Sequence, residues 1–170
     1  MNARIVAGFV TVFVVAQFQD TLATYALLAA FMPLVAGLSG NSGAQAIAVT
    51  IRSLAVGELP PGREFRAIRR ELAIGLIRGV VLASIGAVLA AVAVGLLGGS
   101  TDGLTAGDLA AVVWISTIVG LMTAALAGAS IPLLLRRLGQ DPALASNIFL
   151  TMITDAVGFG IFLATATLLL

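Results

Sequence analysis

The sequence contains no cysteine, histidine or lysine among its 170 residues, and only 10% of the residues are charged. Without cysteine the chain has neither a disulfide framework nor a thiolate metal site. Without histidine and lysine it lacks the usual general base, the commonest transition-metal ligand and Schiff-base chemistry. The net charge of +1 gives no sign of nucleic-acid binding. We therefore expect neither an enzyme nor a partner made of nucleic acid.

Apolar residues make up 60% of the chain, and the mean hydropathy is +1.13. These values lie far outside the range of soluble domains, and the length leaves room for about five membrane helices of roughly 20 residues each. The expected fold is an all-α integral membrane protein in the lipid bilayer, with one transmembrane domain and no soluble regulatory domain. The five expected helices cover approximately residues 4–20, 22–56, 70–97, 107–135 and 142–169.

The second of these segments is too long to cross a bilayer as one straight helix. Residues 22–56 would extend roughly 50 Å as an α-helix, against a hydrocarbon core of about 30 Å. We expect this helix to bend, unwind or project beyond the bilayer. Pro33 removes a backbone donor and glycines unwind easily, so they mark the expected break: Pro33, Gly37, Gly40 and Gly43.

The charged residues between the segments predict an orientation. With five crossings, the arginines outside or at the ends of the spans fall on one side, and the opposite loops carry only acids. The positive-inside rule then places the N-terminus in the cytoplasm and Leu170 outside, in the cell inner (plasma) membrane. The residues used are the bases Arg4, Arg63, Arg66, Arg69, Arg70, Arg136 and Arg137 and the acids Asp20, Asp102 and Asp108.

Two helix starts have recognisable capping patterns. Thr105, with Asp108 three residues later, resembles a capping box. Asp141 is a plausible N-cap residue, because Pro142 suits the first helical position.

Asp155 lies in the middle of the last apolar segment, which contains no basic residue to neutralise it. A carboxylate at that depth costs about 2.5 to 3.5 kcal/mol on insertion scales, so it normally faces a polar cavity or a partner. On a helix it shares a face with Asn147, Thr151 and Gly158, and Thr154 lies beside it. Small and hydroxyl residues alone would indicate helix packing. The carboxylate favours a cation pathway instead.

A second polar group lies in the long second segment. Asn41 and Gln45 would present two amides from one helix face, and a broken helix exposes carbonyl oxygens. Such ligands suit a hard cation, so the candidates are Mg²⁺, Ca²⁺, Mn²⁺, Na⁺ or a proton. A two-fold axis would place two Asp155 carboxylates opposite each other and match one divalent cation. A monomer with a proton-binding acid is the alternative.

Glu71 lies near the start of the third segment and has two interpretations. Arg78 is seven residues further along the same face and Arg52 lies at similar depth, so a structural ion pair is the simpler one. A cation site at the inner mouth of a pathway is the other.

Two stretches carry a family resemblance. Pro33-Leu-Val-Ala-Gly-Leu-Ser-Gly-Asn-Ser-Gly-Ala-Gln45, with Ile51 to Glu58, resembles the second-helix signature of the MgtE family of magnesium channels. Pro132 to Asn147, with Thr154-Asp-Ala-Val-Gly158, is similar to a later motif of that family. The likeness covers essentially the whole chain.

The resemblance implies a homodimer whose axial pore is lined by the second and fifth helices. It implies Mg²⁺ as the main ion, with Mn²⁺, Co²⁺ and Ca²⁺ as further candidates, and an acid matching Asp155 that holds a largely hydrated ion. Positions matching Gly37, Gly40, Asn41 and Asn147 would shape that site, and Glu71 matches a family acid near the cytoplasmic side.

The chain departs from the family pattern in three places. Ala44 stands where a polar residue is frequent, and Ile148 stands where proline is common. Family members usually carry a Mg²⁺-sensing cytosolic region ahead of the first helix, and only three residues precede Arg4. We expect no gating by such a sensor within this chain, and a separate regulatory subunit is an open alternative.

The expected function is passive flow of divalent cations, with Asp155 as the selectivity acid. The second hypothesis is a proton- or Na⁺-coupled secondary transporter that uses Asp155 for the coupling ion. A third is a non-transporting membrane scaffold that presents the segment Arg63–Arg70 to a soluble partner or to anionic lipid.

Overall fold

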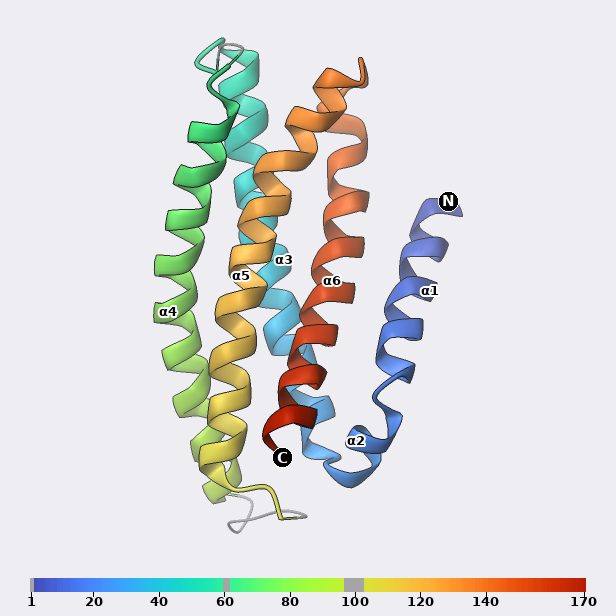
Figure 1. The fold of residues 1–170 in the computed structure, drawn as a ribbon, viewed down its shortest axis with the longest axis vertical. Helices are drawn as coiled ribbons and strands as arrows, with labels where there is room; N and C mark the ends of the chain where they lie inside the picture. The colour runs from blue at the N-terminus through green and yellow to red at the C-terminus, as the bar shows by residue number, and fades with distance from the viewer. Residues whose placement is uncertain (1, 60–61, 97–102) are drawn as a thin grey trace.

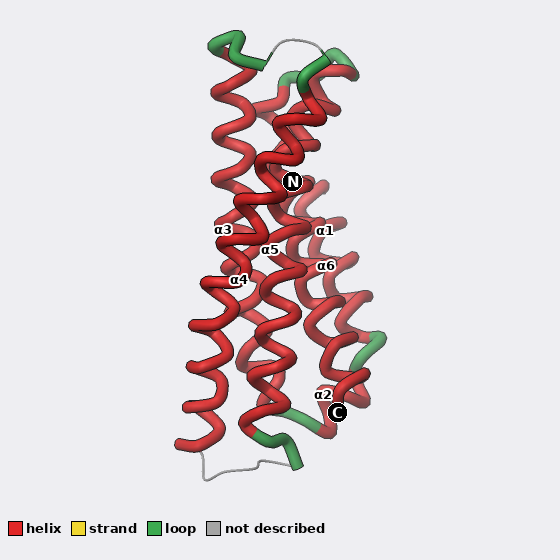
Figure 2. Tube along the Cα trace, turned by 60° about the vertical axis from the view of Figure 1, so that its left-hand side comes forward, coloured by secondary structure: helices red, strands yellow, loops and turns green. Residues whose placement is uncertain are grey.

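The computed structural model describes residues 2–59, 62–96 and 103–170. Over these residues the chain forms six α-helices, and Figures 1 and 2 show the long ones side by side in an elongated bundle. In chain order they are α1 (Asn2–Ala16), α2 (Gln19–Thr24), α3 (Leu27–Ala55), α4 (Glu64–Leu96), α5 (Ala106–Arg137) and α6 (Pro142–Leu169).

Four helices, α3 to α6, are long and apolar enough to cross a membrane. They make the chain an α-helical membrane protein, as the composition predicts. The first expected helix, 4–20, instead ends at Ala16, and the chain turns before the short α2. At 15 residues α1 is about 22 Å long, which is less than the hydrocarbon thickness of about 30 Å. A fifth crossing therefore stays a prediction.

The expected break in the second segment is at a different place. The helix α3 continues without interruption through Pro33 and the glycines that follow it. The interruption falls earlier, at Tyr25 and Ala26, and Tyr25 has the non-helical angles φ −124° and ψ 71°. With 29 residues α3 is about 44 Å long, against a hydrocarbon core of about 30 Å, so projection beyond that core stays a prediction.

Neighbouring helices pack closely at Gly43, whereas a Cβ atom added at Gly37 would meet nothing within 4 Å. A Cβ atom added at Gly128 of α5 would lie 2.6 Å from Ala46 Cβ and 2.7 Å from the backbone oxygen of Gly43. A Cβ at Gly75 of α4 would lie 2.7 Å from Ala125 Cβ on α5. Small residues let membrane helices approach in this way. The helix α5 thus forms the centre of the bundle, between α4 and α6 (Figure 1), and it also contacts α3.

Both predicted helix caps are confirmed. Asp108 N–H donates to Thr105 Oγ1 over 3.2 Å, and Thr105 N–H donates to Asp108 Oδ2 over 3.1 Å, which completes a capping box. Asp141 Oδ1 accepts a hydrogen bond of 2.8 Å from Ala143 N–H, and Pro142 opens α6. These caps fix where α5 and α6 begin.

Candidate cation site

Asp155 lies half-buried on α6, at a groove of about 480 Å³ between α6 and α1. No other described side chain forms a hydrogen bond or ion pair with its carboxylate, and the described residues contain no cluster of three or more acids that could hold a metal. The groove therefore brings together three of the predicted site residues, Asn147, Thr151 and Asp155. The full lining is Ala7, Gly8, Thr11, Asn147, Ile148, Thr151 and Asp155.

The two hydroxyl groups of the groove donate to their own helices. Thr151 Oγ1 donates to the backbone oxygen of Asn147 over 2.9 Å, and Thr11 Oγ1 donates to that of Ala7 over 3.1 Å. A hydroxyl that donates in this way keeps acceptor lone pairs free. The groove thus carries carboxylate, amide and hydroxyl oxygens, which are the ligand types of a hard cation.

Thr11 is the residue that the sequence reasoning missed. It is the only side chain with a hydroxyl between Ile5 and Ala16, and this isolated polar position was the available signal. A single threonine in an apolar helix usually makes only the backbone hydrogen bond seen here. Only the three-dimensional structure shows that Thr11 lies next to α6 in the groove.

Thr154 and Gly158 face α3 rather than the groove. Thr154 is buried, and its hydroxyl donates to the backbone oxygen of Leu150 over 3.0 Å. Cβ atoms added at Gly40 and Gly158 would approach Thr154 Oγ1 to 4.0 Å and Ala36 Cα to 3.8 Å. One face of α6 therefore packs against α3, and an adjacent face carries Asp155.

The exposed face of α3 is made of small and polar residues: Gly37, Asn41, Ala44 and Ala48. Residue numbers increase along α3 in the direction in which the numbers of their contacts on α6 decrease, so the two helices are antiparallel. With right-handed helices meeting through those contacts, the exposed α3 face and Asp155 lie on the same side of the helix pair. Gly37 and Asn41 thus belong to the surface that continues from the groove.

Gln45 does not accompany Asn41 as the spacing predicts. Its Oε1 accepts a hydrogen bond of 2.9 Å from Arg78 Nη1 of α4, so its amide is turned toward α4. Asn41 makes no hydrogen bond to any other described residue. The two amides of α3 therefore separate, and one of them anchors an arginine within the α4 span.

The predicted ion pair between Glu71 and Arg78 is absent from the described residues, where the ion pair present joins Arg137 to Glu64 at 3.4 Å. Seven residues of helix separate Glu71 and Arg78 by about 10 Å, and Gln45 offers Arg78 a nearer partner. Glu71 instead lines a cavity of about 210 Å³ that also contains Arg63, Arg66 and Arg70. The structure does not bring Glu71 into the groove of Asp155.

Four long apolar helices, and a half-buried acid with no partner among the described side chains, define a polytopic membrane protein with a polar groove between α6 and α1. A family model named MgtE, described as a divalent cation transporter, matches residues 32–165. The chain belongs to this family, as its two motifs predict. The family is described by transport and not by an enzymatic reaction.

Curated relatives match almost the whole chain. The "Magnesium transporter MgtE" of Thermus thermophilus is 35% identical over 168 residues, which cover 98% of this chain and 34% of the relative. The protein of the same name from Bacillus subtilis is 31% identical over 160 residues, covering 94% and 33%. That from Enterococcus faecalis is 29% identical over 161 residues, covering 95% and 33%. The chain spans about a third of the length of these relatives.

Proposed function

We propose that this chain conducts Mg²⁺ across the cell inner membrane through a pore on the axis of a homodimer. The observation that carries the proposal is the Asp155 carboxylate, which has no described partner and lies in a groove lined by oxygen ligands. The names of the curated relatives, all magnesium transporters, support Mg²⁺ as the ion. In this arrangement α1 is the fifth crossing helix, and α3 and α6 line the pore.

The size and chemistry of the groove suit a hydrated ion. Mg²⁺ gives up its water reluctantly and often keeps several water ligands in proteins. A buried water needs roughly 10 to 15 Å³ of such a volume, so the groove of about 480 Å³ has room for an ion and its waters. Asp155, Asn147 and Thr151 would therefore hold the ion through its water shell, which leaves it mobile enough to pass.

The residue types on the exposed face of α3 favour a position at a pore over a position against lipid. The outward face of α4 carries large apolar side chains, of which Ile77 is 66% and Val88 is 63% exposed. The exposed face of α3 carries Gly37, Asn41 and Ala44 instead. Glycine and an amide gain little from contact with acyl chains, but they suit a water-filled path or a second subunit.

A homodimer would bring two Asp155 side chains to one ion. Two carboxylates balance one divalent charge, and their mutual repulsion in an empty site favours cation entry. No second acid accompanies Asp155 within the described groove, so a separate coupling-ion site is not apparent. We therefore favour passive flow over coupled transport.

The arginine-bearing turns between α3 and α4 and between α5 and α6 share one end of the bundle (Figure 1). We assign this end to the cytoplasm by the positive-inside rule, which puts the N-terminus inside and Leu170 outside. Asp102 and the side chain of Arg4 lie outside the described residues. Residues 1–170 act in this proposal as one cation-transport domain, and a separate regulatory subunit would approach it from the cytoplasmic end.

Ion flux into liposomes tests the proposal. With the purified protein reconstituted and a Mg²⁺-sensitive dye inside, we expect Mg²⁺ entry to follow the Mg²⁺ gradient and to be unchanged by an added pH or Na⁺ gradient. Protein-free liposomes give the background. Entry that an opposing pH or Na⁺ gradient accelerates would support the coupled transporter, and no entry with folded protein would support the scaffold.

A further inference from the structure

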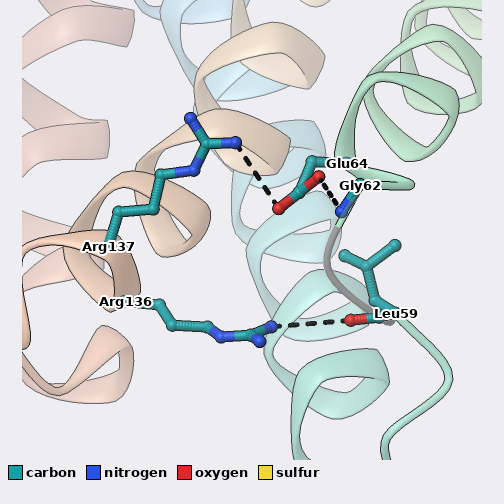
Figure 3. A network of polar contacts seen from close by, with 5 residues as sticks. All are labelled: Leu59, Gly62, Glu64, Arg136 and Arg137. Carbon is teal, nitrogen blue, oxygen red and sulfur yellow. Dashed lines mark hydrogen bonds and ion pairs between the residues drawn. The ribbon is translucent and has the colours of Figure 1, made fainter.

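The arginines at the proposed cytoplasmic end form two groups with different surroundings. Arg136 and Arg137 hold the turn between α3 and α4 against the end of α5 (Figure 3). Arg137 pairs with Glu64 at 3.4 Å, and Arg136 Nη1 donates to the backbone oxygen of Leu59 over 3.5 Å. Glu64 Oε2 also accepts a hydrogen bond of 2.8 Å from Gly62 N–H. These two arginines therefore have a structural task.

The arginines of the second group do not hold other segments of the described chain in place. Arg63, Arg66, Arg69 and Arg70 are all exposed, and none of their side chains forms a hydrogen bond or ion pair with another described residue. Together with Gly62 and Phe65 they line a concave surface of about 590 Å³ that includes no acid. We call these four arginines and Phe65 the arginine patch. Guanidinium groups present planar pairs of donors that match phosphate oxygens, so the patch suits a phosphate-bearing anion.

The depth of the patch indicates where that anion comes from. Large apolar side chains are exposed along α4 from Leu76 to Leu96, a rise of about 30 Å, which equals the hydrocarbon thickness of a bilayer. Arg69 and Arg70 then lie about 10 Å beyond the hydrocarbon edge. Arginine side chains are long enough to reach back into the headgroup layer from there.

We propose that the arginine patch binds the phosphate headgroup of an anionic phospholipid. Three of its arginines also line the adjoining cavity between α3 and α4, but that cavity contains the acids Glu58 and Glu71 as well. The acid-free arginine patch, and not that cavity, therefore holds the phosphate. The proposal depends on the charge and depth of the patch, so it stands or fails separately from Mg²⁺ conduction.

Lipid binding to the purified full chain in a neutral detergent tests this proposal. Native mass spectrometry would compare phosphatidylglycerol with phosphatidylcholine on the native chain and on the double variant Arg66→Gln/Arg70→Gln. We expect a preference for phosphatidylglycerol on the native chain. At about one kilocalorie per arginine, the double variant should bind it roughly 30-fold more weakly. Arg52→Gln is the control, because Arg52 is exposed on α3 but lines neither cavity.

Three outcomes would overturn the assignment. Equal binding of the two lipids would show that charge is not recognised, and equal loss in Arg52→Gln would show a diffuse effect of net charge. Displacement of the lipid by inorganic phosphate at comparable concentration would make the patch a site for a free anion. If the double variant unfolds, the single variants Arg66→Gln and Arg70→Gln should each weaken binding about fivefold.

Discussion

Replacing Asp155 with asparagine should lower Mg²⁺ flux by roughly a hundredfold or more. Asparagine keeps the shape of the side chain, removes the charge and replaces one acceptor oxygen with an NH2 donor. A unit charge pair 4 Å apart contributes about 4 kcal/mol at an effective dielectric constant of 20, and each 1.4 kcal/mol is a factor of ten. Even a water layer between the acid and the ion leaves a large share of that attraction. Dye-monitored flux into liposomes measures the effect.

Asp20→Asn is the matched control for Asp155→Asn. Asp20 is an exposed acid in the first turn of α2, so the same change in net charge is made away from the groove. We expect its flux to match that of the native protein. An Asp155→Asn protein that is folded and conducts Mg²⁺ normally would remove Asp155 from the pathway and with it the proposed site.

Mixed assemblies distinguish a shared pore from one pathway per subunit. When native and Asp155→Asn chains are combined in equal amounts, random pairing makes roughly one quarter of the dimers fully native. A pore that needs both carboxylates should then retain about a quarter of the native flux. Independent pathways in each subunit would retain about half, and that result would contradict the paired site on the dimer axis.

The residues around Asp155 show how far the sequence could predict the site. Asn147, Thr151 and Asp155 come from one helix, and the period of 3.6 residues places them on one face whatever surrounds that helix. The same period put Thr154 and Gly158 beside them. Only the packing of α3 against α6 shows that these two belong to a neighbouring, buried face. Helical periodicity predicts which residues lie on the same side of the helix. Only the tertiary contacts show which of them face the groove and which pack against another helix.

The glycines of α3 show why the predicted break was wrong. Glycine in a helix has two opposite uses, since it eases unwinding and it also allows a neighbouring helix to come close. The sequence around Gly43 cannot separate these uses, because the contact that decides between them is made by Gly128, far away in the chain. The pairing of Gln45 with Arg78 is a further long-range contact of this kind.

Gly128→Ala should destabilise the folded protein more than any other glycine-to-alanine substitution in the helices near the site. The new Cβ would lie 2.7 Å from the backbone oxygen of Gly43 and 2.6 Å from Ala46 Cβ, so α3 and α5 would have to move apart. Overpacking of this kind costs about 1 to 3 kcal/mol, and backbone atoms leave no rotamer change as relief. The midpoint of unfolding in detergent, followed by circular dichroism, measures the change.

Two further glycine substitutions serve as comparisons for the loss of stability in Gly128→Ala. At Gly43 the new Cβ would meet Leu150 Cδ1 at 2.5 Å, but this is the end of a flexible side chain, so Gly43→Ala should cost less. Gly95 is exposed on α4 with nothing within 4 Å of its added Cβ, so Gly95→Ala should be neutral or up to about 1 kcal/mol stabilising. Equal unfolding midpoints for Gly128→Ala and Gly95→Ala would contradict a close α3–α5 crossing.

Because that crossing fixes α3 against the centre of the bundle, a displaced α3 should also carry Gly37 and Asn41 away from Asp155. Gly128→Ala should therefore lower Mg²⁺ flux under conditions in which the protein is still folded.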